Sequence, residues 1–178
     1  MASVALTPDH DTIEAEIFVA APPERVFQAI TDPSQMPRWW GQASMYRITE
    51  CQADLRPGGK WHTIGVRADG TSFRVDGEYL EVDPPRLLVH TWSPSFSSAV
   101  GTVVRWELEA RPVHNLQAQG PHKSGTGTAV RLRHSGFAGD EKACKDHGEG
   151  WKRVLAWMQA FAEAGETIDT RLPLQSAG

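Results

Sequence analysis

Cysteine and long apolar runs are scarce in this sequence. Its 178 residues include two cysteines, Cys51 and Cys144, which lie too far apart to form a metal-binding or redox motif. So few thiols fit the reducing environment of the cytoplasm, where we expect the protein to be. No run approaches the roughly 18 apolar residues of a membrane span, and the chain opens with no basic segment followed by an apolar one. We therefore expect neither a membrane partner nor secretion.

An excess of positive charge is also missing. Lysine and arginine number 18 against 22 aspartates and glutamates, which gives a formal net charge of −4. Because nucleic-acid binding needs a basic surface, nucleic acid is not an expected partner. The sequence has no phosphate-binding glycine loop, dinucleotide fingerprint, nucleophile elbow or His-Glu-x-x-His zinc string either, so no cofactor is expected.

Tryptophan, in contrast, is abundant: seven tryptophans stand beside six phenylalanines and two tyrosines. The length suits one domain rather than two, and a chain of this size buries enough surface to fold without a disulfide or a metal. We expect a single domain over residues 12–164, between an N-terminal extension at 1–11 and a loose C-terminal tail at 165–178.

The order of elements predicts one strand, two short helices, six strands and one long helix. Strands are predicted where apolar residues alternate between turn residues, and helices where apolar residues recur every three to four positions. The predicted strands are 12–20, 46–53, 60–67, 72–82, 86–92, 101–111 and 128–136, the predicted helices are 22–30, 34–40 and 140–164, and 112–127 is a long flexible loop. One amphipathic helix facing a seven-stranded antiparallel sheet is a two-layer α+β arrangement.

Alternation along the strands also assigns the inner face of the sheet. Arginine and glutamate mark one face of most strands, so the opposite face should point inward. The inward residues with polar ring or hydroxyl groups are Trp61, Thr63, Tyr79, His90, Trp92, Trp106 and His134, with His147 and Trp151 facing them from the helix. Indole and imidazole can stack a planar guest and hydrogen-bond it, so we expect a cavity here. The alternative is that these side chains only fill the core.

Two short strings leave alternatives open. Trp39 and Trp40 lie where the short helices should close one end of the barrel, and they either plug the core or gate an entrance. Gly148 and Gly150 lie inside the long helix, where each costs about 1 kcal/mol relative to alanine. Either the helix begins late, near Glu149, or it kinks, or it approaches the sheet or a ligand closely.

Several strings, taken in order, resemble one known family. They are residues 21–27 (APPERVF), 39–41 (WWG), 54–59 (DLRPGG), 77–85 (GEYLEVDPP), 91–92 (TW), 134–137 (HSGF) and 147–151 (HGEGW). With the order of elements, they resemble the SRPBCC superfamily of START-like, helix-grip proteins, and within it the branch named after the C-terminal domain of the activator of Hsp90 ATPase. The resemblance implies a birch-allergen-like sheet, curved around the C-terminal helix, with a cavity for small apolar molecules. Large side chains are usual where this chain has Thr63 and Gly65, so we expect a roomier pocket there.

Three functions are compatible with these features. The first is non-catalytic binding of a small apolar or aromatic molecule by Trp39, Trp40, Trp61, Thr63, Tyr79, His90, Trp92, Trp106, His134, His147 and Trp151. The second, known in the superfamily, is a polyketide cyclase- or hydratase-like enzyme in which His90, His134 or Tyr79 would move protons. The third is a chaperone-associated interaction domain. The inward histidines have no accompanying carboxylate or cysteine pattern, so no metal site is expected, and a homodimer is the default oligomer.

Overall fold

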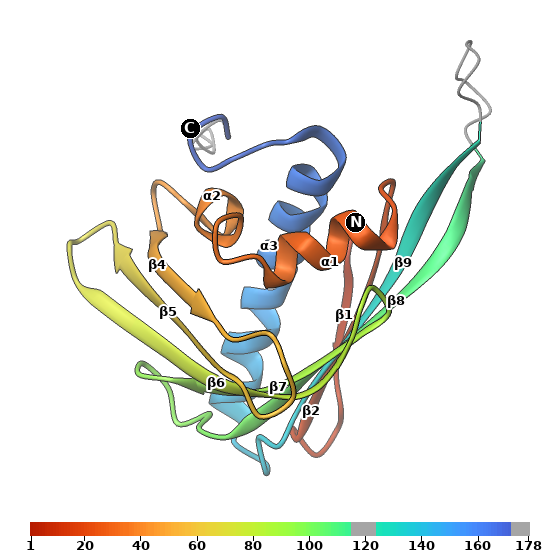
Figure 1. The fold of residues 1–178 in the computed structure, drawn as a ribbon. Helices are drawn as coiled ribbons and strands as arrows, with labels where there is room; N and C mark the ends of the chain where they lie inside the picture. Colours follow the sequence, from red (N-terminus) through yellow and green to blue (C-terminus); the bar gives the residue numbers. More distant parts are fainter. Residues whose placement is uncertain (115–123, 172–178) are drawn as a thin grey trace, which may run out of the picture.

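The computed structural model describes residues 1–114 and 124–171. Within these ranges one antiparallel sheet of nine strands, in the order β1-β2-β9-β8-β7-β6-β5-β4-β3, curves around the long helix α3, and α1 and α2 lie near its C-terminal half (Figure 1). The strands are β1 (Ser3–Leu6), β2 (Thr12–Val19), β3 (Gly41–Gln42), β4 (Tyr46–Ala53), β5 (Lys60–Arg67), β6 (Ser72–Asp83), β7 (Leu87–Pro94), β8 (Thr102–His114) and β9 (Ser124–Ser135). The helices are α1 (Pro23–Thr31), α2 (Met36–Trp39) and α3 (Glu141–Ala164).

The predicted α+β helix-grip fold is confirmed, but the sheet has nine strands rather than seven. The two additional strands are both short and both lie at the edges of the sheet. β1 lies in the expected N-terminal extension and pairs with β2, with Leu6 opposite Ile13. β3 contributes two residues that pair with Arg47 and Tyr46 of β4. Runs of two and four residues are too short to show a period of two, so the sequence did not reveal them.

The expected loop at 112–127 is wrong at both of its ends. Strands β8 and β9 continue their ladder through Pro112 opposite Thr126 as far as His114 opposite Ser124. Figure 1 shows these strands projecting beyond their neighbours. Their ends lack an apolar pattern because β2 stops pairing with β9 at Thr128, so this part of the ladder depends on backbone hydrogen bonds rather than on a core. Residues 115–123 of the expected loop lie outside the described residues.

Helix α3 is continuous, which excludes the late start near Glu149. The carboxylate of Asp140 caps the helix by accepting a hydrogen bond from the Ala143 N–H at 3.0 Å, and Gly165 ends it with a left-handed φ of 70°. Gly148 has a packing reason: a Cβ there would lie 3.1 Å from Cδ1 of Leu6 in β1. The strand that the sequence did not reveal therefore explains this glycine.

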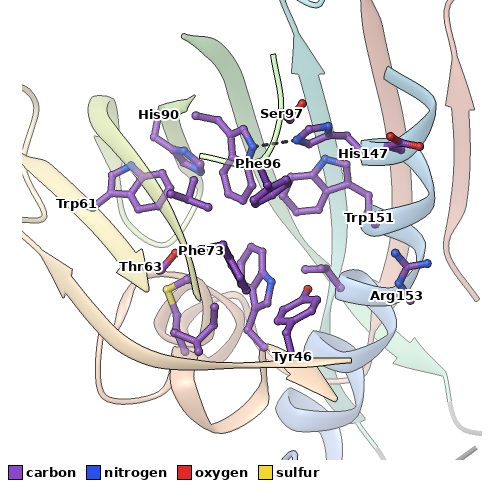
Figure 2. Close-up of a pocket in the computed structure, with 18 of the residues that line it drawn as sticks. Tyr46, Trp61, Thr63, Phe73, His90, Phe96, Ser97, His147, Trp151 and Arg153 are labelled. Carbon is purple, nitrogen blue, oxygen red and sulfur yellow. Dashed lines mark hydrogen bonds between the residues drawn. The ribbon is translucent and has the colours of Figure 1, made fainter. Parts of the chain in front are cut away.

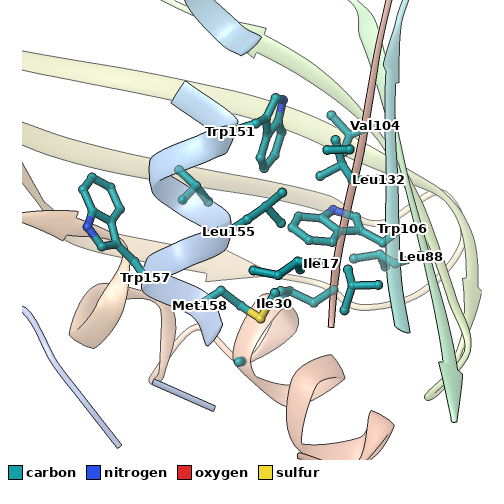
Figure 3. Close-up of a cluster of buried hydrophobic side chains, with 14 of the residues drawn as sticks. Ile17, Ile30, Leu88, Val104, Trp106, Leu132, Trp151, Leu155, Trp157 and Met158 are labelled. Atoms are coloured by element: carbon teal, nitrogen blue, oxygen red, sulfur yellow. The ribbon is translucent and has the colours of Figure 1, made fainter. Parts of the chain in front are cut away.

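The hydrophobic core lies between α3 and the sheet. Trp151, Leu155 and Met158 point from one face of the helix toward residues of the central strands such as Trp106 and Leu132 (Figure 3). The assignment of the inner face is correct, because its members are buried except for Gly77, which is half-buried. Burial of this apolar area is the main force that holds the helix in the curve of the sheet.

The chain beyond α3 is less loose than expected where it is described. Ile168 is buried, and its N–H donates a hydrogen bond to the Arg38 carbonyl at 2.8 Å. The Arg171 guanidinium donates to the carbonyl oxygens of Trp39 and Gly41. This segment therefore fastens α2 to the end of α3. No helix in the described part of the chain is long and apolar enough to cross a membrane.

Candidate functional site

A pocket of about 440 Å³ lies between the concave face of the sheet and α3. Figure 2 shows Trp61 and His90 on one side of it and His147, Trp151 and Arg153 of α3 on the other. Its volume falls in the range of pockets that take small organic molecules. Aromatic residues are the most numerous kind in its lining, so a guest inside it would contact ring faces and edges.

Nine of the eleven predicted site residues line this pocket, and two do not. The nine are Trp40, Trp61, Thr63, Tyr79, His90, Trp92, Trp106, His147 and Trp151. Trp39 is fully buried beside them, and its indole N–H donates to the Ala29 carbonyl at 2.9 Å, so it plugs the core. His134 is likewise fully buried and lies behind the wall. Of the two alternatives for the double tryptophan, Trp39 therefore fits the plug, whereas Trp40 is part of the pocket wall.

The tryptophan rings of the wall contact one another. The centroid of Trp92 lies 6.3 Å from that of Trp40, 6.0 Å from that of Trp151 and 5.9 Å from that of Trp61. Such pairs add stability beyond the area they bury and fix the direction of each ring. The indole N–H of Trp61 is buried and has no hydrogen-bond partner within the described residues.

Glycines on the inner face make room for two of these rings. Gly65 lies opposite Phe73 and Gly77 lies opposite Trp61 in the pairing of β5 with β6. A Cβ on Gly65 would lie 2.2 Å from the Phe73 ring, and one on Gly77 would lie 2.3 Å from the Trp61 ring. The expectation of extra room at Gly65 is therefore wrong, because the aromatic side chain opposite fills that space.

Each of the three inward histidines accepts a hydrogen bond from a tryptophan. The Trp92 indole N–H donates to Nε2 of His147 at 3.2 Å, marked by the dashed line in Figure 2. The Trp106 N–H donates to Nε2 of His90 at 3.3 Å. The third pair, which lies behind the wall, joins the Trp151 N–H to Nδ1 of His134 at 3.1 Å.

The other ring nitrogen of each histidine is also engaged. Nδ1 of His147 lies 2.9 Å from the Ala143 carbonyl oxygen, and Nδ1 of His90 lies 3.0 Å from the Thr91 carbonyl oxygen. Nε2 of His134 lies 2.7 Å from Oγ1 of Thr102. Because an indole can only donate, one nitrogen of each ring must be the acceptor and the other must carry the proton. All three imidazoles are therefore neutral, each in a defined tautomer.

Burial reinforces this neutral state. It lowers the pKa of His90 to about 4 and also lowers the pKa of His147. Burial, with the nearby His147 and His90, holds the pKa of His134 well below its ordinary value. At neutral pH these rings present neither a positive charge nor a free lone pair to the pocket.

A cysteine and a tyrosine of the pocket are also held in their neutral forms. Burial raises the pKa of the Cys51 thiol to about 11 and the pKa of the Tyr79 phenol well above its ordinary value. Neither group is a thiolate or phenolate nucleophile at neutral pH. Among the described residues, no group of three His, Cys, Asp or Glu side chains is placed to hold a metal ion.

Sequence reasoning missed the polar side chains at the edge of the pocket. Tyr46 enters from β4, Arg67 from the end of β5, and Arg153 from α3. Arg153 follows Trp151 by two positions and is exposed, as helical spacing predicts, yet it also lines the pocket. The pocket is wide enough to extend past the buried face of α3, so the Arg153 guanidinium lies at the edge of the pocket.

Comparison with known proteins agrees with this architecture. The family model described as activator of Hsp90 ATPase homolog 1-like protein matches residues 20–118, more than half of the chain. The chain belongs to this family. The resemblance seen in the sequence is thereby confirmed. No protein with a curated description matches the sequence.

Several solved structures share the fold of this family member. A protein from Rhodobacter sphaeroides is 20% identical, with a TM-score of 0.68 over 90% of this chain and 96% of that one. CalU16 from Micromonospora echinospora is 23% identical, with a TM-score of 0.58 over 93% of this chain and 85% of that one. DynU16, a protein in the dynemicin biosynthetic locus, is 20% identical, with a TM-score of 0.63 over 88% of this chain and 48% of that one. At these identities the likeness concerns the fold alone.

Proposed function

We propose that this protein binds a small apolar or aromatic molecule in the pocket between the sheet and α3 and releases it chemically unchanged. The hydrogen bonding of the histidines is the observation that carries the proposal. A cyclase or hydratase of this fold would need an imidazole or phenol that can take up or give up a proton. His90 and His147 have both nitrogens engaged, and Tyr79 is a phenol of raised pKa.

The wall favours binding for a second reason. Its indole rings are fixed by mutual contacts and by the imidazoles that accept their N–H groups, so the pocket is largely pre-formed. A rigid pocket loses little conformational freedom when a guest enters, which favours affinity. The guest should carry an aromatic ring or another flat apolar body, because aromatic residues are the most numerous kind in the lining.

Occupancy of the pocket can be tested by blocking it. Gly150 lines the pocket, and no heavy atom lies within 4 Å of the position that its Cβ would take. Gly150→Leu should therefore fill part of the space without a clash in the helix. Ala156→Leu is the matched control, because Ala156 is an exposed position of the same helix. The probe is N-phenyl-1-naphthylamine, an uncharged fluorophore that emits strongly in apolar surroundings.

The native protein should bind the probe at one saturable site. Gly150→Leu should weaken binding by about tenfold or more, which corresponds to roughly 1.4 kcal/mol, while Ala156→Leu leaves it unchanged. Far-ultraviolet circular dichroism checks that both variants remain folded. If the native protein shows no saturable binding, or if the two variants bind alike, the pocket is not the binding site. Native mass spectrometry of freshly purified protein then identifies any guest that co-purifies.

A further inference from the structure

The charged side chains that line the pocket differ in sign from the protein as a whole. The chain carries a net charge of −4, yet the lining includes the cations Arg67, Lys142 and Arg153 and only two carboxylates, Asp140 and Asp146. What matters for a guest is which of these charges are already neutralised by neighbours.

Both carboxylates of the lining are engaged. Asp140 accepts hydrogen bonds from the Ser98 hydroxyl and from the Ala143 N–H as the N-cap of α3. Asp146 accepts from Nζ of Lys142 in an ion pair along the helix. Asp146 is therefore paired with Lys142, and Asp140 is hydrogen-bonded by neutral donors, which leaves the two arginines as the cations of the lining without an ion-pair partner in the described residues.

Neither arginine has an ion-pair partner among residues 1–114 and 124–171. Arg67 lies with its guanidinium carbon 5.0 Å from the centre of the Phe73 ring and donates from Nη1 to the Thr71 hydroxyl and the Ser72 carbonyl. Asp69 shares its turn, and the hydrogen bonds from the N–H and hydroxyl of Thr71, with a smaller contribution from the Arg67 charge, lower its pKa, but its carboxylate forms no ion pair with Arg67. A guanidinium has five N–H donors, so most of those on Arg67 remain available.

Tyr46 lies at the same end of the pocket. It pairs with Arg67 across β4 and β5, and its ring packs against Phe73 and Trp157. Figure 2 shows the Tyr46 hydroxyl pointing into the pocket and Arg153 on the facing helix. Although burial raises the pKa of Tyr46, the Trp40 side chain and the Arg153 charge act in the opposite direction, so Arg153 lies within electrostatic range of the Tyr46 phenol.

The geometry points to a ligand that carries a carboxylate: an aromatic or other apolar monocarboxylic acid whose body lies among the tryptophans and whose anionic group lies at Arg67, Arg153 and Tyr46. This inference rests on the proposed binding function and specifies the chemical class of the guest. Arginine suits the task because its planar donors match the two oxygens of a carboxylate. Arg67 is half-buried and Arg153 is exposed, so water screens the attraction of Arg67 for an anion less than that of Arg153.

The test compares an acid with its uncharged counterpart of nearly the same shape. Isothermal titration calorimetry measures the affinity of 1-naphthylacetate and of 1-naphthylacetamide for the native protein and for two double variants. Arg67→Gln/Arg153→Gln removes the two uncompensated charges. Lys145→Gln/Lys152→Gln is the control, because it removes the same net charge from exposed residues of α3 that do not line the pocket.

The native protein and the lysine double variant should bind the acid about tenfold or more tightly than the amide. The arginine double variant should bind both compounds with nearly equal affinity, and its affinity for the amide should stay close to that of the native protein. Added salt should narrow the native preference. Equal affinity of the native protein for acid and amide overturns the inference while the binding function stands, as does a preference that survives in the arginine double variant. Failure of both compounds to bind overturns the inference together with the binding function.

Discussion

Each of the three inward histidines is hydrogen-bonded to a tryptophan. An imidazole in an apolar interior is costly unless both nitrogens are hydrogen-bonded, and an indole N–H is costly unless it finds an acceptor. The pairs Trp92–His147, Trp106–His90 and Trp151–His134 meet both needs at once. Removing one partner therefore leaves an unpaired polar group, and the loss should exceed that of an ordinary hydrogen bond.

The variant His134→Ala tests whether the loss of one partner costs more than an ordinary hydrogen bond. His134 suits the test because it has no exposed surface. The substitution leaves the Trp151 N–H without its acceptor, removes one of the partners of the Thr102 hydroxyl and opens a cavity, so we expect a loss of about 3 kcal/mol in the free energy of unfolding. His62→Ala is the control, because His62 pairs with Glu50 on the outer face of the sheet and should cost less than about 1 kcal/mol. Urea denaturation measures both values. Equal losses for the two variants would contradict the role assigned to the buried pair.

At the scale of single elements, the long strands and helix α3 were predictable and the short edge strands were not. Strands β4 to β7 lie within one or two residues of their expected bounds, because one buried face imposes a period of two on the sequence. β1 and the outer ends of β8 and β9 depend on backbone pairing with a neighbour, which side-chain patterns do not report. For the same reason, Gly148 had no evident role within α3. The side chain that packs against it, Leu6, lies on β1.

The two glycines of α3 should respond differently to alanine. Gly150→Ala should stabilise the protein by up to about 1 kcal/mol, because the helix gains propensity and the new methyl group meets no atom. Gly148→Ala should gain less or lose stability, since its methyl group would press on Leu6 at 3.1 Å. Thermal denaturation ranks the two variants. A larger stabilisation from Gly148→Ala would mean that β1 does not pack against the helix as described.

At the scale of the whole molecule, the sequence identified the face on which the pocket opens but not its polar edge. Alternation placed Trp61, His90 and Trp92 on one surface because that surface is apolar along its length. Arg67 and Arg153 are charged, and sequence patterns assign such residues to solvent unless the shape of the cavity is known. The hydrogen-bond partners of the histidines were hidden too, since each pair joins residues far apart in the chain.

The neutral histidines should make the fold sensitive to mild acid. The pKa of His90 is about 4 in the native state, against an ordinary value of 6.5, so the unfolded chain binds more protons between these pH values. Lowering the pH through this window should therefore destabilise the native state, by about 3 kcal/mol for His90 alone at 1.36 kcal/mol per pH unit. Chemical denaturation at pH 7 and pH 4.5 measures the loss. His90→Gln, which cannot titrate, should lose less over the same range, and an unchanged loss would show that another group is responsible.

The contact of Trp40, Trp61 and Trp151 with the Trp92 ring has an optical consequence. Indole rings separated by about 6 Å couple their electronic transitions, so this cluster should absorb and rotate near-ultraviolet light as a unit rather than as separate chromophores. A molecule that slides between the rings would alter that coupling directly. The protein thus has an intrinsic spectroscopic label at the place where a guest would enter.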